Sequence, residues 1–353
     1  MILSITENKI LLVNRYTCSN LGDQLIAQVF KELLQKHLQF EVIQTDYTSH
    51  LSDPLAVNSV LKHRKLKKLI KYFISPQLVW FRNYYRLNKL IKIEKPKLII
   101  VGGGQLLMPG VFCVAAFVWA LLAKRNNIKL IFSNIGCGGN FSAFDRFLLR
   151  KTFTNADGIL FRDMISLKNA LGVSDKQNHV KFSASNDIVY TIQKQVDTNQ
   201  NKDIIGIGLI DFAVYCFHQK KISRNSFYEH MIAYMSLDQL VLNRKVVLFY
   251  NTAEDYEESI CFQAYYLKTR KILLPIADVK NVEGLINFIS SCEKIITARM
   301  HAAIIANINS VDVDIIPLSE KLRVLKEQKT LSILKMHETT TQQTLRFLGR
   351  FVK

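Results

Sequence analysis

The chain is built from short apolar runs that alternate with segments in which apolar residues recur at helical spacing. In chain order, the clearest runs are KILLV, LIIV, KLIF, GILF, IIGIG, VVLF, KIIT and DIIPL. Short buried strands in series with helices are typical of a parallel sheet that is covered on both faces. The sequence therefore predicts an α/β fold, with residues 40–46 and 271–276 as further strands.

The length of the chain bears on the number of domains. A chain of 353 residues is too long to fold around a single hydrophobic core in most proteins, so two domains are expected. Residues 196–203 are polar and unpatterned, and we interpret them as the linker. The predicted parts are an α/β domain over residues 1–195, a second over residues 203–325 and a helical tail over residues 326–353. We expect two Rossmann-like domains facing a central cleft, because open parallel sheets bind ligands beyond the carboxyl ends of their strands.

The net charge of +18 calls for an anionic partner. Phosphate-bearing substrates, anionic membrane surfaces and nucleic acid all meet that requirement. The sequence contains no signature of a nucleic-acid-binding module, so we expect no nucleic acid partner. The most basic segment, residues 62–95, places Lys65, Lys67, Lys68 and Lys71 around an apolar stripe. Both a solvated basic helix and a helix lying on a membrane surface fit this pattern.

Two features bear on the location of the protein. The N-terminus lacks the basic start, apolar core and cleavage site of a signal peptide. The longest apolar run, residues 110–124, is shorter than the ~20 residues that a membrane-spanning helix needs, so a buried helix is predicted there. The expected location is the cytoplasm, either free or peripheral on the inner face of the cell membrane.

The most informative junction is IITARMHAAIIANI, residues 295–308. Its first isoleucines end a predicted strand and Ala302 begins an apolar helix, so Arg299 and His301 fall in the turn between them. A helix N-terminus offers free N–H groups, arginine adds a fork for phosphate or carboxylate, and histidine can transfer a proton near neutral pH. We interpret the turn as an anion site. The alternative is an arginine that extends to solvent beside a structural histidine.

Other predicted strand ends carry polar side chains. Arg162 follows a strand, Asp163 is expected to orient it or to cap the next helix, and Ser166 opens that helix. Asp187 follows a later strand, and Lys321 follows the last one. The carboxyl ends of parallel strands meet at one edge of a sheet, so these side chains are candidates for the site.

Two glycine-containing loops complete the set of residues expected to face the cleft. NLGD, after the first strand, supplies Asn20, Gly22 and Asp23, and Asp23 is expected to be a helix N-cap or a polar group of the cleft. Glycine at such turns permits a positive φ and a close approach of ligand to backbone. The loop after a strand in the middle of the domain supplies Gly102, Gly103 and Gly104.

Several classes of site have no support in the sequence. VGGGQLL lacks the G-K-[ST] of a phosphate-binding loop, and NIGCGGN is not the dinucleotide fingerprint. No H-E-x-x-H, G-x-S-x-G or EF-hand pattern is present, and the six cysteines show no metal-like spacing. We therefore predict no metal site and no bound cofactor.

Taken in order, NLGD, GGG, FRDMIS, SNDI, IGIGL and ARMH with a downstream EK resemble the motifs of the polysaccharide pyruvyltransferase family. The resemblance extends from Asn14 to Lys326, and R-x-H with its later lysine and R-D-x-x-S are the most specific parts. It implies a type-B glycosyltransferase-like architecture, with the first domain on the acceptor side and the second on the donor side. It also implies transfer of a pyruvyl group from phosphoenolpyruvate onto two hydroxyls of a sugar, as a cyclic ketal, without metal or redox cofactor.

The resemblance suggests a role for each candidate. Arg299 and His301 match the donor-binding and catalytic pair of the family, Arg162 the arginine of R-D-x-x-S, and Lys321 the late lysine. We expect the three cations to hold the anionic groups of phosphoenolpyruvate, and His301 to be the general acid or a second phosphate donor. Asp187 is a candidate acceptor of a hydroxyl proton. The acceptor sugar is expected on a cell-surface polysaccharide or on a polyprenyl-diphosphate-linked precursor at an anionic membrane surface.

Two other functions stay open at this point. A glycosyltransferase that uses a nucleotide-sugar would have the same two-domain plan, with a diphosphate at Arg299. A non-catalytic anion-binding module would need the cations but no acid.

Overall fold

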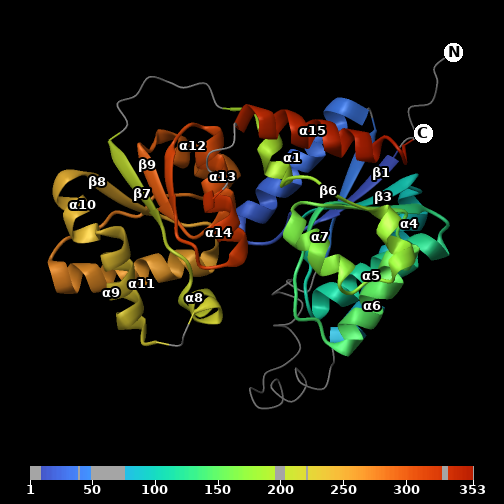
Figure 1. Cartoon of the computed structure of the whole chain (residues 1–353), viewed down its shortest axis with the longest axis horizontal. Coiled ribbons are helices and arrows are strands. Elements are labelled where there is room, and N and C mark those ends of the chain that lie inside the picture. Colours follow the sequence, from blue (N-terminus) through green and yellow to red (C-terminus); the bar gives the residue numbers. More distant parts are fainter. Residues whose placement is uncertain are drawn as a thin grey trace. The chain divides into compact units, whose positions relative to one another are not determined.

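We describe the chain from a computed structural model (Figure 1). It describes residues 9–38, 40–48, 76–194, 203–219, 222–327 and 333–352. The chain forms two compact units. Unit 1 comprises Met1–Cys18, Ile26–Ile188 and Glu338–Lys353, and unit 2 comprises Ser19–Leu25 and Val189–His337. The predicted linker and the lysines at positions 65–71 lie outside the described residues, apart from Asp203.

The sheet of unit 1 has six strands in the order β2-β1-β3-β4-β5-β6, and every neighbouring pair is parallel. The strands are β1 (Lys9–Asn14), β2 (Glu41–Asp46), β3 (Leu98–Leu107), β4 (Lys129–Cys137), β5 (Gly158–Phe161) and β6 (Phe182–Ala184). Short 3₁₀ helices precede and follow β6, η2 (Lys176–Lys181) and η3 (Ile188–Thr191). The order reverses between β1 and β3, which marks the topological switch point of this sheet.

Helices cover both faces of this sheet (Figure 1). On one face, α4 (Pro76–Glu94), α5 (Val111–Arg125), α6 (Ala143–Asn155) and α7 (Met164–Leu171) share a core with the strands. The apolar run predicted as a buried helix is α5, whose Trp119 is fully buried. On the other face lie α1 (Leu21–Leu38) and α15 (Ile333–Leu348).

Two threonines join α15 to unit 1. Asn134 of β4 donates from Nδ2 to Thr344 Oγ1 at 3.1 Å, and Asn186 donates from Nδ2 to Thr340 Oγ1 at 3.1 Å. Both threonines are fully buried. The buried face of α15 therefore contains hydroxyl groups as well as apolar side chains, and each hydroxyl is hydrogen-bonded to unit 1. The last residues of the chain are therefore part of the first unit.

The glycines at positions 102–104 lie inside β3, so the prediction that they form a loop after the strand is wrong. A Cβ at Gly102 would contact Phe30 of α1 at 3.1 Å. Gly103 has φ +73°, and a Cβ there would overlap Cγ2 of Ile26. The close approach of α1 to the strand, together with the positive φ, accounts for these glycines.

The sheet of unit 2 has four parallel strands in the order β10-β9-β7-β8. They are β7 (Ile204–Gly208), β8 (Lys245–Phe249), β9 (Lys294–Thr297) and β10 (Asp312–Ile315). The predicted strand over residues 271–276 is wrong: this segment makes a single isolated bridge, between Ile276 and Leu248. The order reverses between β7 and β9, so the switch point of unit 2 lies between the ends of these two strands.

Seven helices of unit 2 follow or precede these strands within the described ranges (Figure 1). They are α8 (Phe212–His218), α9 (Arg224–Met235), α10 (Leu237–Asn243), α11 (Ala253–Arg270), α12 (Val282–Ser291), α13 (Met300–Ile308) and α14 (Glu320–Glu327). A search of the described helices found none long and apolar enough to cross a membrane.

Replacing Gly103 by alanine should destabilise unit 1 by about 3 kcal/mol, because the added methyl meets Ile26 and the backbone has a positive φ. Gly110 is a matched control, since it has φ +77° but no atom within 4 Å of the added Cβ. Gly110→Ala should therefore cost only about 1 kcal/mol. Urea unfolding of both variants measures the difference, and equal losses would show that packing against α1 is not the reason for Gly103.

Candidate functional site

The turn between β9 and α13 lies at the switch point of unit 2. Thr297 ends the strand, and Arg299 is the N-cap residue of the helix. The Arg299 N–H donates to Thr297 Oγ1 at 3.1 Å, and the Arg299 side chain makes no capping hydrogen bond to α13. The predicted strand-to-helix turn is thus confirmed at Arg299, but the helix begins at Met300 rather than at Ala302, so His301 lies in the first turn of α13 and not in the turn before it.

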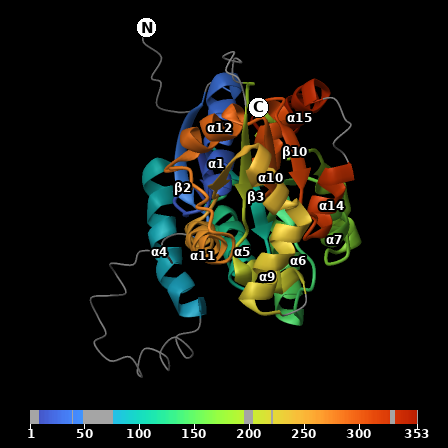
Figure 2. The ribbon, with the colours of Figure 1, turned by 90° about the vertical axis from the view of Figure 1, so that its left-hand side faces the viewer.

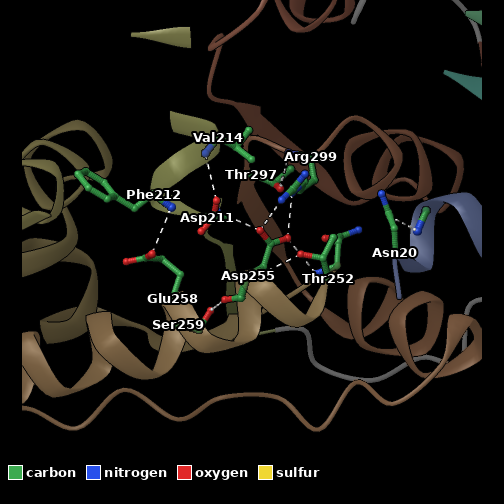
Figure 3. Close-up of polar contacts among 12 residues, drawn as sticks. Asn20, Asp211, Phe212, Val214, Thr252, Asp255, Glu258, Ser259, Thr297 and Arg299 are labelled. Carbon is green, nitrogen blue, oxygen red and sulfur yellow. Dashed lines mark hydrogen bonds and ion pairs between the residues drawn. The ribbon is translucent and has the colours of Figure 1, made fainter. Parts of the chain in front are cut away.

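Arg299 is paired with Asp255, a residue that the sequence had not singled out (Figure 3). Arg299 Nε donates to Asp255 Oδ2 at 2.9 Å, and Nη2 donates to Oδ1. The carboxylate is fully buried, while the guanidinium side chain is about one fifth exposed. Asp255 thus fixes the plane of the guanidinium and leaves its Nη1 edge for another acceptor.

Asp255 also joins the loops that follow two other strands. Its Oδ1 accepts the N–H of Asp211 at 3.0 Å, after β7, and its Oδ2 accepts the N–H of Asn251 at 3.4 Å, after β8. Thr252 Oγ1 in turn accepts the Asp255 N–H at 3.1 Å as the N-cap of α11. One buried carboxylate therefore connects the loops that follow β7, β8 and β9.

Glu258 repeats this arrangement one helical turn further along α11 (Figure 3). It accepts the Phe212 N–H at 3.2 Å and the Tyr228 hydroxyl at 2.5 Å. Burial and the hydrogen bond to Glu258 raise the pKa of Tyr228. The first turn of α8 is thus attached to α11 at two points, Asp211 and Phe212.

His301 lies against the first turn of α1, after β1. A Cβ at Gly22 would overlap Nδ1 of the imidazole, so glycine at this position permits the close approach. Asn20 Oδ1 accepts the Gly22 N–H at 2.9 Å, and the Leu21 N–H donates to Asn251 O at 2.8 Å. Two motifs far apart in the sequence, NLGD and R-x-H, therefore meet within unit 2.

Of the two alternatives predicted for Asp23, the helix N-cap is wrong. Helix α1 begins at Leu21, and Asp23 lies in its first turn. The residue that precedes the helix is Asn20, whose carbonyl accepts the N–H groups of Asp23 and Gln24 at 3.1 Å. An acidic side chain at this position suits the positive end of the helix dipole.

Lys321 lies in the first turn of α14, beyond β10. Burial lowers the pKa of His218, and the nearby positive charge of Lys321 lowers it further. Lys321 therefore lies close enough to the end of α8 for its charge to act on His218.

Arg162 belongs to a separate cluster in unit 1. It is buried, and its Nη1 donates to Asp187 Oδ2 at 3.2 Å while Nη2 donates to Gln105 Oε1. Asp163 Oδ2 lies 3.4 Å from Nε. A Cβ at Gly136 would meet Gln105 and the Arg162 Nε at 2.5 and 2.9 Å, so this glycine makes room for the cluster.

Arg162 and Asp187 were both predicted as site residues. The sequence did not predict that they bind each other. Of the two roles expected for Asp163, the cap of α7 is confirmed, since its Oδ1 accepts the Ser166 N–H at 2.6 Å. Ser166 is buried in the first turn of that helix. Among the described residues, no group of three or more His, Cys, Asp or Glu is arranged to hold a metal ion.

Asp187→Ala should destabilise unit 1 by about 3 kcal/mol, because it leaves the buried Arg162 with one carboxylate fewer. A surface pair is the matched control: Asp175 lies 3.7 Å from Arg150, and both side chains are about half exposed. Asp175→Ala should change the free energy of unfolding by less than about 0.5 kcal/mol. Chemical denaturation of the two variants makes the comparison, and a small effect of Asp187→Ala would argue against a stabilising role for the buried pair.

The architecture is similar to that of solved sugar-nucleotide enzymes. UDP-GlcNAc 2-epimerase from Methanocaldococcus jannaschii superposes with a TM-score of 0.53 at 12% identity, over 97% of this chain and 99% of that chain. The corresponding enzyme from Rickettsia bellii gives 0.53 at 10% identity, over 98% and 97%. That from Neisseria meningitidis, bound to UDP-GlcNAc, gives 0.51 at 13%, over 98% and 93%. At these identities the likeness concerns the fold alone, and it confirms the predicted two-domain, Rossmann-like, type-B glycosyltransferase-like plan.

Sequence comparison identifies the family. A comparison with curated protein sequences returned no match. The family profile described as polysaccharide pyruvyl transferase matches residues 20–311, which include the loop at Asn20, the Arg162 cluster and the Arg299–His301 turn. The chain belongs to the polysaccharide pyruvyl transferase family, and it is a transferase.

Proposed function

We propose that this protein transfers a pyruvyl group from phosphoenolpyruvate to two hydroxyls of one sugar residue, forming a cyclic ketal. The observation that carries the proposal is the turn at Arg299 and His301. A fixed guanidinium, an imidazole and an uncapped helix N-terminus meet there, at the switch point of a parallel sheet. The family of the chain supports pyruvyl transfer in polysaccharide biosynthesis.

Phosphoenolpyruvate carries a phosphate and a carboxylate, so its site needs several donors. We assign the Nη1 edge of Arg299 and the positive end of the α13 dipole to one anionic group. Lys321 is the proposed second cation. Arg162 is already bonded to Asp187 and Gln105, so its proposed part is to hold Asp187 rather than to hold the donor.

The proposed reaction begins with proton transfer to the vinyl CH₂ of phosphoenolpyruvate. This step forms a methyl group and an oxocarbenium-like carbon. One sugar hydroxyl attacks that carbon and loses its proton, and inorganic phosphate then leaves with the C–O bonding electrons. The second hydroxyl adds to the resulting cation and loses its proton, which closes the ring. Asp187 is the proposed acceptor of a hydroxyl proton, and the reaction is written with no further cofactor.

We propose as the acceptor a sugar of a cell-surface polysaccharide, such as a capsule or exopolysaccharide, or of its polyprenyl-diphosphate-linked precursor. Such a precursor is presented at the cytoplasmic face of the membrane, so the proposed location is cytoplasmic and peripheral to that face.

His301→Gln tests whether the imidazole is the acid, because glutamine can donate a hydrogen bond to phosphate but cannot supply a proton. As an acid, His301 should contribute about 10²–10⁴-fold to kcat, with little change in KM for phosphoenolpyruvate. Phosphate release with acceptor present, together with mass spectrometry of the ketal product, measures the rate. The exposed His230→Gln is the control. A raised KM with kcat retained would make His301 a phosphate-binding group instead.

The same assay separates the proposal from nucleotide-sugar transfer. Phosphate release from phosphoenolpyruvate and a gain of one pyruvyl ketal on the acceptor support pyruvyl transfer. Release of nucleotide from UDP-GlcNAc, with no reaction of phosphoenolpyruvate, would support a glycosyltransferase.

Asp255→Asn should lower kcat about 10²-fold without raising KM for phosphoenolpyruvate. The amide no longer fixes the guanidinium plane through two charged bonds, while the positive charge of Arg299 is no longer neutralised. Glu229→Gln is a matched control, since Glu229 binds Arg270 through two bonds of 3.0 and 2.8 Å in the same unit. Equal losses in the two variants would indicate a general loss of structure rather than a positioning role for Asp255.

A further inference from the structure

The outer surface of the α4–α5–α6 layer of unit 1 is basic and exposes large apolar side chains. The three helices pack side by side, α4 against α5 and α5 against α6, and their inner faces belong to one core (Figures 1 and 2). Their outer faces therefore form one continuous side of the unit. We call this the helical face.

Eight basic side chains are exposed on the helical face, on all three helices: Arg86, Lys89, Lys92, Lys124, Arg125, Arg146, Arg150 and Lys151. Arg150 is paired with Asp175, at 3.7 Å. The two acidic residues of the same described helices are already engaged. Glu94 accepts a hydrogen bond from Lys9 at 3.0 Å, and Asp145 is buried as the partner of the α6 N-cap and of the Gly110 N–H. The helical face therefore carries a strong local excess of positive charge.

Large apolar residues lie among these charges rather than apart from them. Tyr85 and Ile93 of α4 are 74% and 63% exposed, and Phe144 and Phe147 of α6 are each 52% exposed. Phe144 and Phe147 are one helical turn apart, and Lys151 Nζ lies 5.8 Å from the centre of the Phe147 ring. Single exposed apolar residues are ordinary on a protein surface, but four on one basic face call for a partner.

We propose that the helical face binds the surface of an anionic lipid bilayer. Lysine and arginine are attracted to anionic headgroups, and aromatic or aliphatic side chains beside them can enter the boundary between headgroups and acyl chains. The charge of the face matches such a surface. It does not match a second copy of this chain, because a two-fold contact would set eight like charges against their equivalents.

The helical face lies next to the part of unit 1 that we connect with chemistry. Phe144 and Phe147 lie in the first half of α6, which follows the carboxyl end of β4. The Arg162–Asp187 pair lies at the carboxyl ends of β5 and β6 in the same sheet. The inference deepens the proposed function where the acceptor is lipid-linked, since a membrane-bound sugar would meet this edge. Bilayer binding itself does not depend on that proposal.

Vesicle flotation without any substrate tests the inference. Wild-type protein should float with vesicles of phosphatidylcholine containing 30% phosphatidylglycerol (roughly the anionic content of a charged leaflet) and not with phosphatidylcholine alone. K89Q/K92Q/K151Q should weaken binding at least ~10-fold, since each lysine near an anionic surface contributes about fivefold. F144S/F147S should weaken it as well, because the aromatic side chains no longer enter the interface.

Two matched controls come from unit 2. K245Q/K268Q/K280Q removes the same charge from exposed lysines elsewhere, and F217S removes another exposed phenylalanine. Both should bind vesicles as the wild type does. Equal losses in the control and test variants would overturn the inference, as would equal binding to neutral vesicles. Loss of a concentration-dependent dimer or of duplex DNA binding in K89Q/K92Q/K151Q, with vesicle binding unchanged, would assign the face to those partners instead.

An assay of pyruvyl transfer to a water-soluble acceptor tests the proposed function separately from membrane binding. K89Q/K92Q/K151Q should retain wild-type kcat in that assay, because none of these lysines lies in the Arg299 or Arg162 cluster. A wild-type protein that transfers pyruvate but never floats would overturn the membrane inference alone. A protein that floats but does not use phosphoenolpyruvate would overturn the proposed function alone.

Discussion

The buried pair of Asp255 and Arg299 is the interaction on which the candidate site depends. A charge removed from water is costly unless it is paired and hydrogen-bonded. Asp255 is fully buried, and it meets this requirement with a bidentate arginine and two backbone N–H groups. Those partners come from the ends of three different strands. The need to satisfy one carboxylate thus specifies how the loops after β7, β8 and β9 lie relative to one another, and hence where Arg299 points.

The hydrogen bonds that the buried Asp255 carboxylate requires also fix the positions of the loops at the switch point of unit 2. At a switch point the loops of neighbouring strands turn away from each other and leave a space. The Asp211 N–H and the Arg299 guanidinium lie on either side of this space, and Asp255 bonds to both from α11. Glu258 adds a second attachment at Phe212. The carboxyl edge of this sheet is therefore rigid at its centre, which a site for a small anion requires.

Local patterns allowed the strands and the Arg299–His301 turn to be predicted, because an apolar run followed by helical spacing is a property of neighbouring residues. Features that depend on distant partners were not predictable in this way. Asp255 has the sequence of an ordinary helix start, with Thr252 as N-cap, and its arginine partner is 44 residues away. The glycines of β3 resembled a loop in the sequence. What requires glycine there is the close approach of Ile26 and Phe30 of α1, which lie far away in the sequence. The apolar segment at residues 271–276 looked like a strand, yet its one bridge is to β8.

The pairing of Arg299 has a consequence for any anion that binds there. An arginine held by a buried carboxylate contributes geometry and hydrogen bonds, but much of its positive charge is already balanced. Under the proposed function this balance is useful, since phosphoenolpyruvate must bind and phosphate must leave the same donors. A site built only from unpaired cations would hold the product as firmly as the substrate, and uniform binding of this kind does not accelerate a reaction. In the proposed function Asp255 therefore contributes orientation rather than attraction, and the charge that attracts the donor is assigned to groups outside the pair, Lys321 among them.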